Sequence, residues 1–278
     1  MHALNAKEVE LRDRSRVILP VFRRRLSRVY DIVSAFTWYQ LQRLGGGTSP
    51  VFVPRAWLPP MALRRRVNGL RDIYSFLAVG KVCSEDVERA VTSVGRDPAA
   101  FRDVLDFGCG CGRTVMWLKD RFPNASLTGT DCDAEAIAWC RAHLPMAHFD
   151  VNQPGPPLPY ADGRFDLVYV VSLFSHFDEE SEEAWLGELA RVTSSGGLVV
   201  ATVHGEYCWR DYPDELVREV RESGFAYVFS DPEGSPSFQT SYHSESYVRE
   251  HFGRHFKVLE YVPRGLNRHQ DLVVLEKP

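Results

Sequence analysis

Residues 104–112 read VLDFGCGCG, an apolar run that stops at alternating glycines. The apolar part predicts a buried strand, and the spacing of Val115, Leu118 and Phe122 predicts a helix over 112–122. Alternate glycines permit positive φ and remove side chains, so a ligand can approach the backbone where the first helical N–H groups lack partners. The stretch therefore predicts a strand, a turn and a helix that bind a polar or anionic ligand.

The spacing of the glycines separates two kinds of ligand. A dinucleotide-binding turn has the pattern G-x-G-x-x-G, but Arg113 stands where its last glycine would be. The pattern D-x-G-x-G-x-G is complete from Asp106 to Gly112. A second predicted strand over 126–131 ends in Asp131, an acid placed to accept hydrogen bonds from a ribose diol. The pattern disfavours a pyrophosphate and favours a ligand that carries a ribose.

Five blocks of the chain resemble the class I S-adenosylmethionine-dependent methyltransferases, in the family's order and at its usual intervals. They are VLDFGCGCG (104–112), GTDCD (129–133), FDVNQ (149–153), FDLVYVVSLFSHF (165–177) and WLGELARVTSSGGLVVATVHG (185–205). The resemblance covers about residues 100–205. It implies an enzyme with S-adenosyl-L-methionine as cofactor and S-adenosyl-L-homocysteine as product. It also implies a Rossmann-like α/β fold whose seven-stranded, mostly parallel sheet has helices on both faces and an antiparallel last strand.

Strands and helices alternate through the centre of the chain, which independently predicts a parallel sheet covered on both faces. We expect strands at 103–107, 126–131, 146–150, 165–171 and 197–203, and helices at 112–122, 133–143 and 180–193. A short helix at 244–251 and strands at 256–262 and 270–276 would close the sheet as a hairpin. Ligands of such sheets bind beyond the carboxyl ends of the strands, where the glycine turn, Asp131 and Asp150 fall.

Charge divides the chain into two parts. Residues 1–80 hold 14 Lys and Arg against 5 Asp and Glu, a net charge of +9. Since the whole chain has a net charge of −4, residues 81–278 carry a net charge of −13. We therefore predict a basic helical extension or lid over 1–80. The catalytic domain follows over 81–278, with an aromatic-rich insertion at about 205–243 that contains one helix at 214–223.

An amphipathic, basic helix is predicted from Pro20 to Leu44. Such a helix can contact an anionic membrane surface, a lipid-linked substrate or an acidic partner. The alternative is a lid packed over the catalytic core with its arginines in water. The sequence leaves both alternatives open, together with the oligomeric state.

The composition is that of an ordinary folded chain, with 44% hydrophobic and 25% charged residues. No apolar run reaches the ~20 residues of a membrane span and no secretory signal is visible, so we predict a cytoplasmic protein. The six cysteines include no C-x-x-C pair, so we expect reduced thiols. A pI of about 6.2 and basic residues confined to helices argue against nucleic acid as a partner.

The resemblance assigns roles to residues at matching positions. Asp106 and the backbone of 108–112 would hold the methionyl end of the cofactor, Asp131 the ribose, and Asp150 with Val151 the adenine, while Arg113 would contact the carboxylate. The structural alternatives are that Asp106 braces the loop, that Asp133 is a helix N-cap and that Asp150 starts a turn. The predicted cofactor-binding set is Asp106, Gly108, Cys109, Gly110, Gly112, Arg113, Asp131, Cys132, Asp150, Val151 and Val171.

Two histidines are the candidates for a catalytic base, which a hydroxyl acceptor would need. His176 follows the fourth predicted strand and His204 follows the fifth, both at the carboxyl edge. Further candidates are Tyr169, His243, Tyr247 and the run 269–271, and a neutral amine or activated carbon would need no strong base. We predict no metal, because no Asp, Asp, Asn pattern is present and a single C-x-C is a poor ligand set.

The fourth predicted strand is followed by Val171-Ser172-Leu173-Phe174 and not by an Asn-Pro-Pro-Tyr run. The absence of that run disfavours amino-methylation of nucleic acid. We predict a methyltransferase that acts on a small or carrier-linked acceptor, such as a sugar or secondary metabolite, with O-methylation favoured. The alternatives are a protein or peptide N-methyltransferase and a non-catalytic scaffold that binds S-adenosylmethionine. A dinucleotide-dependent oxidoreductase is a more distant alternative.

Overall fold

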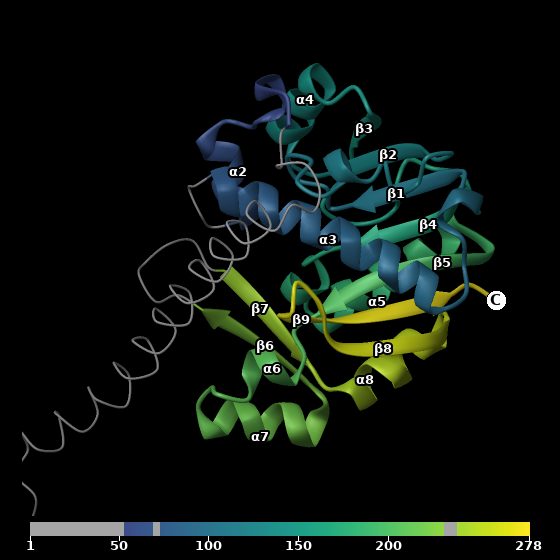
Figure 1. Ribbon diagram of the computed structural model, residues 1–278. Helices are drawn as coiled ribbons and strands as arrows, with labels where there is room; N and C mark the ends of the chain where they lie inside the picture. Colours follow the sequence, from purple (N-terminus) through teal and green to yellow (C-terminus); the bar gives the residue numbers. More distant parts are fainter. Residues whose placement is uncertain (1–52, 69–72, 231–237) are drawn as a thin grey trace, which may run out of the picture. The chain divides into compact units, whose positions relative to one another are not determined.

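The computed structural model describes residues 53–68, 73–230 and 238–278 (Figure 1). Residues 53–278 form one compact unit. The predicted basic helix over 20–44 lies outside the described residues, so its role stays a prediction. Within the described ranges, no helix combines the length and the apolar character that a membrane span requires.

A seven-stranded sheet forms the centre of the unit, in the order β3-β2-β1-β4-β5-β9-β8. All neighbours pair in parallel from β3 to β5, and β9 runs antiparallel to both β5 and β8. The mostly parallel sheet with an antiparallel last strand is therefore confirmed. The strands are β1 (Asp103–Phe107), β2 (Ser126–Asp131), β3 (Ala147–Val151), β4 (Phe165–Val170), β5 (Thr193–Val203), β8 (Lys257–Leu266) and β9 (Gln270–Glu276).

Helices cover both faces of this sheet, as Figure 1 shows. On one face α3 (Ile73–Ser93) and α4 (Ala134–His143) pack against side chains of β1, β2, β4, β5 and β9. On the other face α5 (Glu179–Val192) and α8 (Glu245–His251) pack against the alternate side chains of β1, β4, β5 and β9. Two-sided burial explains why the central strands read as continuous apolar runs rather than as alternating ones.

The predicted helix over 112–122 is wrong. The segment consists of turns around a short 3₁₀ helix, Val115–Trp117. Its backbone mixes bonds over three residues, such as Leu118 N–H to Val115 O at 3.1 Å, with bonds over four, such as Phe122 N–H to Leu118 O at 2.8 Å. The apolar spacing correctly identified three buried side chains, but burial at that spacing suits a 3₁₀ segment as well as an α-helix.

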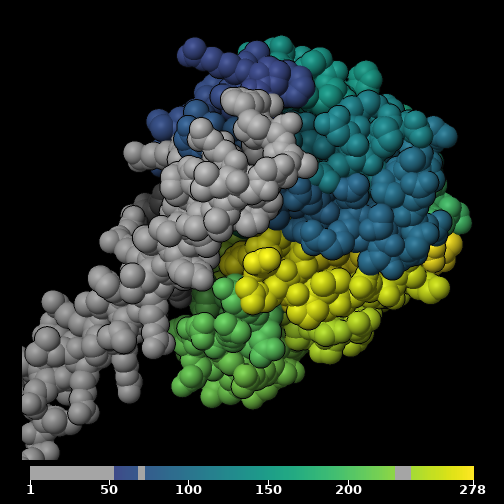
Figure 2. All heavy atoms as spheres, in the orientation of Figure 1, coloured from purple at the N-terminus to yellow at the C-terminus, as the bar shows by residue number. Residues whose placement is uncertain are grey.

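The insertion contains more structure than we predicted. The expected helix is confirmed as α7 (Asp214–Ser223), preceded by α6 (Glu206–Trp209). A separate antiparallel pair, β6 (Phe225–Ser230) and β7 (Phe238–His243), was not predicted. Trp209, Leu216, Val220, Ala226 and Tyr242 form a small core of their own. In Figure 2 these green segments lie beside the yellow strands β8 and β9 on the surface of the unit.

The remaining elements are short. The helix α2 spans Met61–Asn68 and precedes α3, which continues as one helix through residues 80 and 81. Further 3₁₀ helices span Arg55–Trp57, Pro98–Ala100, Phe174–His176 and Phe252–Arg254.

Candidate cofactor and acceptor site

The glycine turn follows β1 and is held against the end of β2. Gly108, Gly110 and Gly112 have φ of 77°, 53° and 78°, a region that side chains other than glycine rarely adopt. The N–H groups of Gly108 and Cys109 both donate to the Thr130 carbonyl, at 2.9 and 3.0 Å. The alternating glycines are therefore required by the path of the backbone.

Asp131 joins the turn to the start of α4. Its Oδ2 accepts a hydrogen bond from the Gly110 N–H and its Oδ1 one from the Asp133 N–H, both at 2.8 Å. A carboxylate has roughly four lone-pair sites, so acceptor capacity remains on this half-buried side chain. The neighbouring residue Cys132 is exposed to solvent. The pKa of its thiol is still raised, because the surrounding protein removes part of its hydration and because Asp131 is negatively charged.

The end of β3 lies next to Asp131, because Thr130 pairs with Asp150 and Asp131 with Val151. The Asp150 carboxylate accepts a hydrogen bond from the Tyr160 hydroxyl at 3.2 Å, and its side chain is 45% exposed. Val151 is 39% exposed, which is unusual for a valine. An acidic group and an uncovered apolar side chain thus stand together beside the ribose candidate.

Two polar residues of this edge were missed by the sequence analysis. Asn152 is buried, accepts a hydrogen bond from the Thr130 hydroxyl at 2.9 Å and donates its backbone N–H to the Asp131 carbonyl at 3.2 Å. Tyr160 reaches Asp150 from a loop. Asn152 follows Asp150 within the FDVNQ block, so its position after a strand was a usable signal, whereas nothing in the sequence points to Tyr160.

Asp106 and Arg113, on either side of the glycine turn in the chain, are both buried. Asp106 is 3% exposed, and burial raises the pKa of its carboxyl to about 7, although the nearby Tyr169 hydroxyl opposes the shift. Arg113 is also buried, and a side chain at Gly80 of α3 would collide with the Arg113 carbonyl. Asp106 Oδ2 is buried with no hydrogen-bond partner among the described residues, so bracing of the loop gains no support, and contact of Asp106 or Arg113 with a ligand stays a prediction.

Two apolar side chains cover the turn. A Cβ atom at Gly108 would lie 2.8 Å from Leu173, in the loop after β4, and one at Gly110 would lie 2.6 Å from Val67 of α2. Next to Val67, Arg66 forms ion pairs with Asp133 at 2.7 Å and Glu135 at 2.5 Å, at the start of α4. These ion pairs attach α2 to the start of α4, and Val67 of α2 lies against the glycine turn.

Four histidines lie beyond the ends of β4 and β5. His176 is exposed and its Nδ1 lies 2.9 Å from the Gln239 carbonyl of β7. His204 is half-buried, and burial with the nearby charges of His269 and His176 lowers the pKa of its imidazole to about 3. His243 is buried against Glu182, with 2.7 Å between Nε2 and Oε2.

The structure places most of the predicted residues at one edge. Gly108, Cys109, Gly110, Gly112, Asp131, Cys132, Asp150 and Val151 lie at the ends of β1, β2 and β3, Val171 follows β4, and His176 and His204 lie beyond β4 and β5. Asp106 and Arg113 are adjacent to this edge but buried. None of the six cysteines forms a disulfide.

Comparison with known proteins gives a family and a set of relatives. Residues 104–197 match the family model described as a methyltransferase domain. The chain is 29% identical over 178 residues to a malonyl-[acyl-carrier protein] O-methyltransferase of Geobacter sulfurreducens, a match that covers 62% of each protein. It is 31% identical over 128 residues to a fatty-acid O-methyltransferase of Mycolicibacterium smegmatis, covering 43% of this chain and 45% of that one. These matches span less than two thirds of the relatives' length.

The fold is shared with solved structures. An S-adenosylmethionine-dependent methyltransferase from Clostridium acetobutylicum superposes with a TM-score of 0.54 at 12% identity, covering 78% of this chain and 96% of the other. At that identity the likeness concerns the fold, and it includes the sheet that carries the site described above.

Proposed function

We propose that this chain, whose residues 104–197 form a class I S-adenosylmethionine-dependent methyltransferase domain, transfers a methyl group to an oxygen atom of a small or carrier-linked acceptor. The proposal rests above all on the hydrogen bond of 2.8 Å between the Gly110 N–H and Asp131. This bond brings a glycine turn and an acidic strand end together at the carboxyl edge, where ligands of such sheets bind.

The residues at this edge fit the cofactor. Asp131 retains acceptor capacity for two ribose hydroxyls, and the exposed Val151 offers an apolar surface for a flat base beside Asp150. The glycine turn and the loop at Val171 would hold the methionyl end. When bound, S-adenosylmethionine supplies an activated methyl group on a positively charged sulfur.

The chain's own residues then have two tasks, which are to align the acceptor and to exclude water. Leu173 and Val67 lie beside Gly108 and Gly110, so apolar side chains border the half-buried glycine turn. The insertion places β7 beside the loop of His176, as the bond to the Gln239 carbonyl shows. The acceptor would lie between that loop and the glycine turn.

Oxygen as the methylated atom is supported by the two relatives named above. Their names give O-methylation of malonyl-[acyl-carrier protein] in one case and of a fatty acid in the other. One of these acceptors is carrier-linked and the other is small, which supports both acceptor classes for this chain. A sugar or a secondary metabolite with a free hydroxyl belongs to the same chemical class.

His176 is the residue we assign to accept the proton of a hydroxyl acceptor. Because its Nδ1 faces the Gln239 carbonyl, Nδ1 carries the hydrogen of the neutral ring and Nε2 is left as the acceptor. His204 is less suited to this task, since a pKa of about 3 makes its imidazole a weak base at neutral pH. A carboxylate acceptor would need neither residue.

Binding and transfer are tested in sequence. Calorimetric titration of the full chain with S-adenosylmethionine, S-adenosylhomocysteine and NAD should show saturable binding of the two adenosyl ligands only. The chain is then incubated with methyl-labelled cofactor and hydroxyl, carboxyl and amine acceptors, each free and carrier-linked. Label in an ester or ether supports the proposal. Binding of NAD alone overturns the cofactor, label only in amines overturns O-methylation, and binding without any transfer favours a scaffold.

A further inference from the structure

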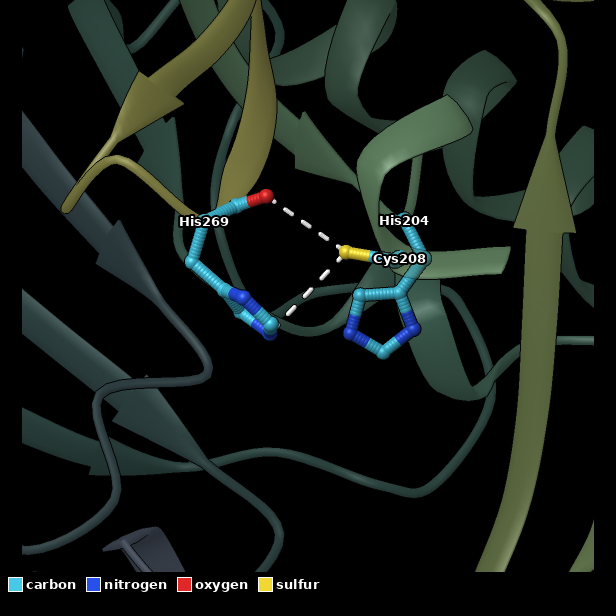
Figure 3. A group of neighbouring side chains, drawn as sticks. All are labelled: His204, Cys208 and His269. Atoms are coloured by element: carbon cyan, nitrogen blue, oxygen red, sulfur yellow. Dashed lines mark hydrogen bonds between the residues drawn. The ribbon is translucent and has the colours of Figure 1, made fainter. Parts of the chain in front are cut away.

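Two histidines and a cysteine converge beyond the end of β5. His204 follows β5, Cys208 belongs to α6, and His269 precedes β9. One nitrogen of each imidazole and the Cys208 sulfur all lie within 4.8 Å of one another. Figure 3 shows the three side chains facing one space, with the Cys208 sulfur 3.9 Å from His269 Nε2.

The backbone holds these residues together. The His204 carbonyl accepts a hydrogen bond from the His243 N–H at 2.9 Å, and the Cys208 and His269 N–H groups are bonded within their own turns. Between His204 and Cys208, Gly205 lies so close to β9 that a Cβ atom there would stand 1.7 Å from the Asp271 carboxylate. Only glycine permits this approach, and the approach brings His269 to the other two residues.

One buried polar atom of the cluster has no hydrogen-bond partner among the described residues. The Cys208 sulfur has a 3.4 Å contact with the His269 carbonyl and a long one to the His269 ring, and thiols are weak donors and acceptors. His204 Nδ1 is buried with no hydrogen-bond partner among the described residues. This unpartnered, buried nitrogen of His204 calls for another partner.

We propose that His204, Cys208 and His269 bind a divalent cation of the zinc class. A thiolate and two imidazoles form a borderline-soft ligand set that suits Zn²⁺ and disfavours Mg²⁺ and Ca²⁺. Ligand atoms around tetrahedral zinc lie roughly 3.3–3.7 Å apart, so the trio closes by about 1 Å on binding. The exposed His269, in the turn between β8 and β9, can make that movement.

Three protein ligands leave a fourth position for water or for an oxygen or sulfur of a bound molecule, the pattern of catalytic rather than structural zinc sites. The prediction of no metal rested on the missing Asp, Asp, Asn pattern and the single C-x-C, and it did not consider His204 and Cys208, which are four residues apart. Cys208 and His269 are separated by 61 residues, so no spacing motif reveals them. The site does not depend on the proposed methyl transfer.

Cobalt(II) is the probe, because thiolate coordination gives it a near-ultraviolet charge-transfer band. The untagged full chain, freed of metal with a chelator, should bind one equivalent of Co²⁺ with this band, and Zn²⁺ should displace it. Cys208→Ser should abolish the band, while His269→Asn should weaken Co²⁺ binding at least tenfold. Cys132→Ser removes an exposed thiol elsewhere and should leave the band unchanged.

Absence of the band in the unmodified chain overturns the proposal, as does its persistence in Cys208→Ser or its loss in Cys132→Ser. Thermal unfolding of the metal-free variants checks that each one folds. If Cys208→Ser does not fold, the site is tested with His269→Asn, which changes an exposed residue. Unchanged Co²⁺ affinity in that variant overturns the proposed site.

Discussion

Asp131 Oδ2 lies 2.8 Å from the Gly110 nitrogen, so a single carboxylate both fixes the glycine turn and faces the edge of the sheet. Asp131→Ala should weaken S-adenosylmethionine binding by roughly 10–100-fold, because hydrogen bonds to a charged group contribute about 1.5–3 kcal/mol. Calorimetry measures the loss.

Asp133→Ala is the matched control. Asp133 accepts hydrogen bonds from the Glu135 and Ala136 N–H groups as the N-cap of α4, which confirms the predicted cap. Its removal should cost about 1 kcal/mol of stability with a much smaller effect on cofactor affinity. Equal losses of affinity in the two variants would contradict a direct role for Asp131.

The ion pairs of Arg66 attach α2 across the glycine turn. Arg66→Ala should raise the rate of cofactor dissociation by roughly two- to fivefold, because exposed ion pairs are weak, and should leave the melting temperature nearly unchanged. Stopped-flow displacement measures the rate. High salt should produce the same acceleration in the unmodified chain, and Arg65→Ala on the same helix should produce none.

Sequence reasoning located the parts of the site that lie at strand ends. Asp131 and Asp150 were predicted because the carboxyl ends of parallel strands share one edge, and that edge is where the structure places them. Tyr160 was missed, and His204 and the run 269–271 were predicted only as candidate bases and not as neighbours of Cys208. These residues come together through loops, whose paths no periodicity encodes.

The two errors of the fold have a similar cause. Apolar spacing over 112–122 identified the buried side chains but not the hydrogen bonds between turns. The pair β6 and β7 was not predicted, because its aromatic residues stand among prolines and glycines.

Burial of Asp106 predicts a pH dependence of stability. Its pKa rises to about 7 in the folded chain from an ordinary 3.8, so the folded state retains a proton that the unfolded state has lost. This group therefore lowers stability progressively as pH rises from about 4 to 7, by up to ~1.4 kcal/mol per pH unit, and no further above pH 7.

Asp106→Asn removes that ionisation. Urea unfolding at pH 5, 6, 7 and 8 should show the stability of the variant relative to the unmodified chain increasing up to pH 7 and then levelling. Asp103→Asn, at the half-buried start of β1, is the control and should show no such increase. A constant difference across the range for Asp106→Asn would mean that its carboxyl stays ionised.

His176→Gln separates hydroxyl from carboxylate acceptors. If the methyl acceptor found in the transfer assay is a hydroxyl, kcat should fall roughly 10²–10⁴-fold, because no side chain then takes up the hydroxyl proton. The affinity for S-adenosylmethionine should stay unchanged. A carboxylate acceptor should be methylated at the original rate. His148→Gln, an exposed histidine on β3, controls for the loss of an imidazole. Full activity of His176→Gln toward a hydroxyl would contradict the assignment.

Two neighbouring glutamates of α5 test how burial changes the contribution of an ion pair to the free energy of unfolding. Glu182 meets His243 and Glu183 meets His255, each at 2.7 Å, but the first pair is 1% and 0% exposed and the second 47% and 23%. Glu182→Ala leaves a buried imidazole without its partner and should cost roughly 3–5 kcal/mol of unfolding free energy. Glu183→Ala should cost less than about 1 kcal/mol.

The buried pair also connects α5 to β7, and thus the sheet to the insertion. Urea unfolding of Glu182→Ala, His243→Ala and the double variant measures the coupling, and the double variant should lose clearly less than the sum of the single losses. Similar losses for Glu182→Ala and Glu183→Ala would show that the His243 contact does not hold the insertion in place. In that case the position of β7 beside His176 would depend on the apolar packing around Trp209 and Tyr242.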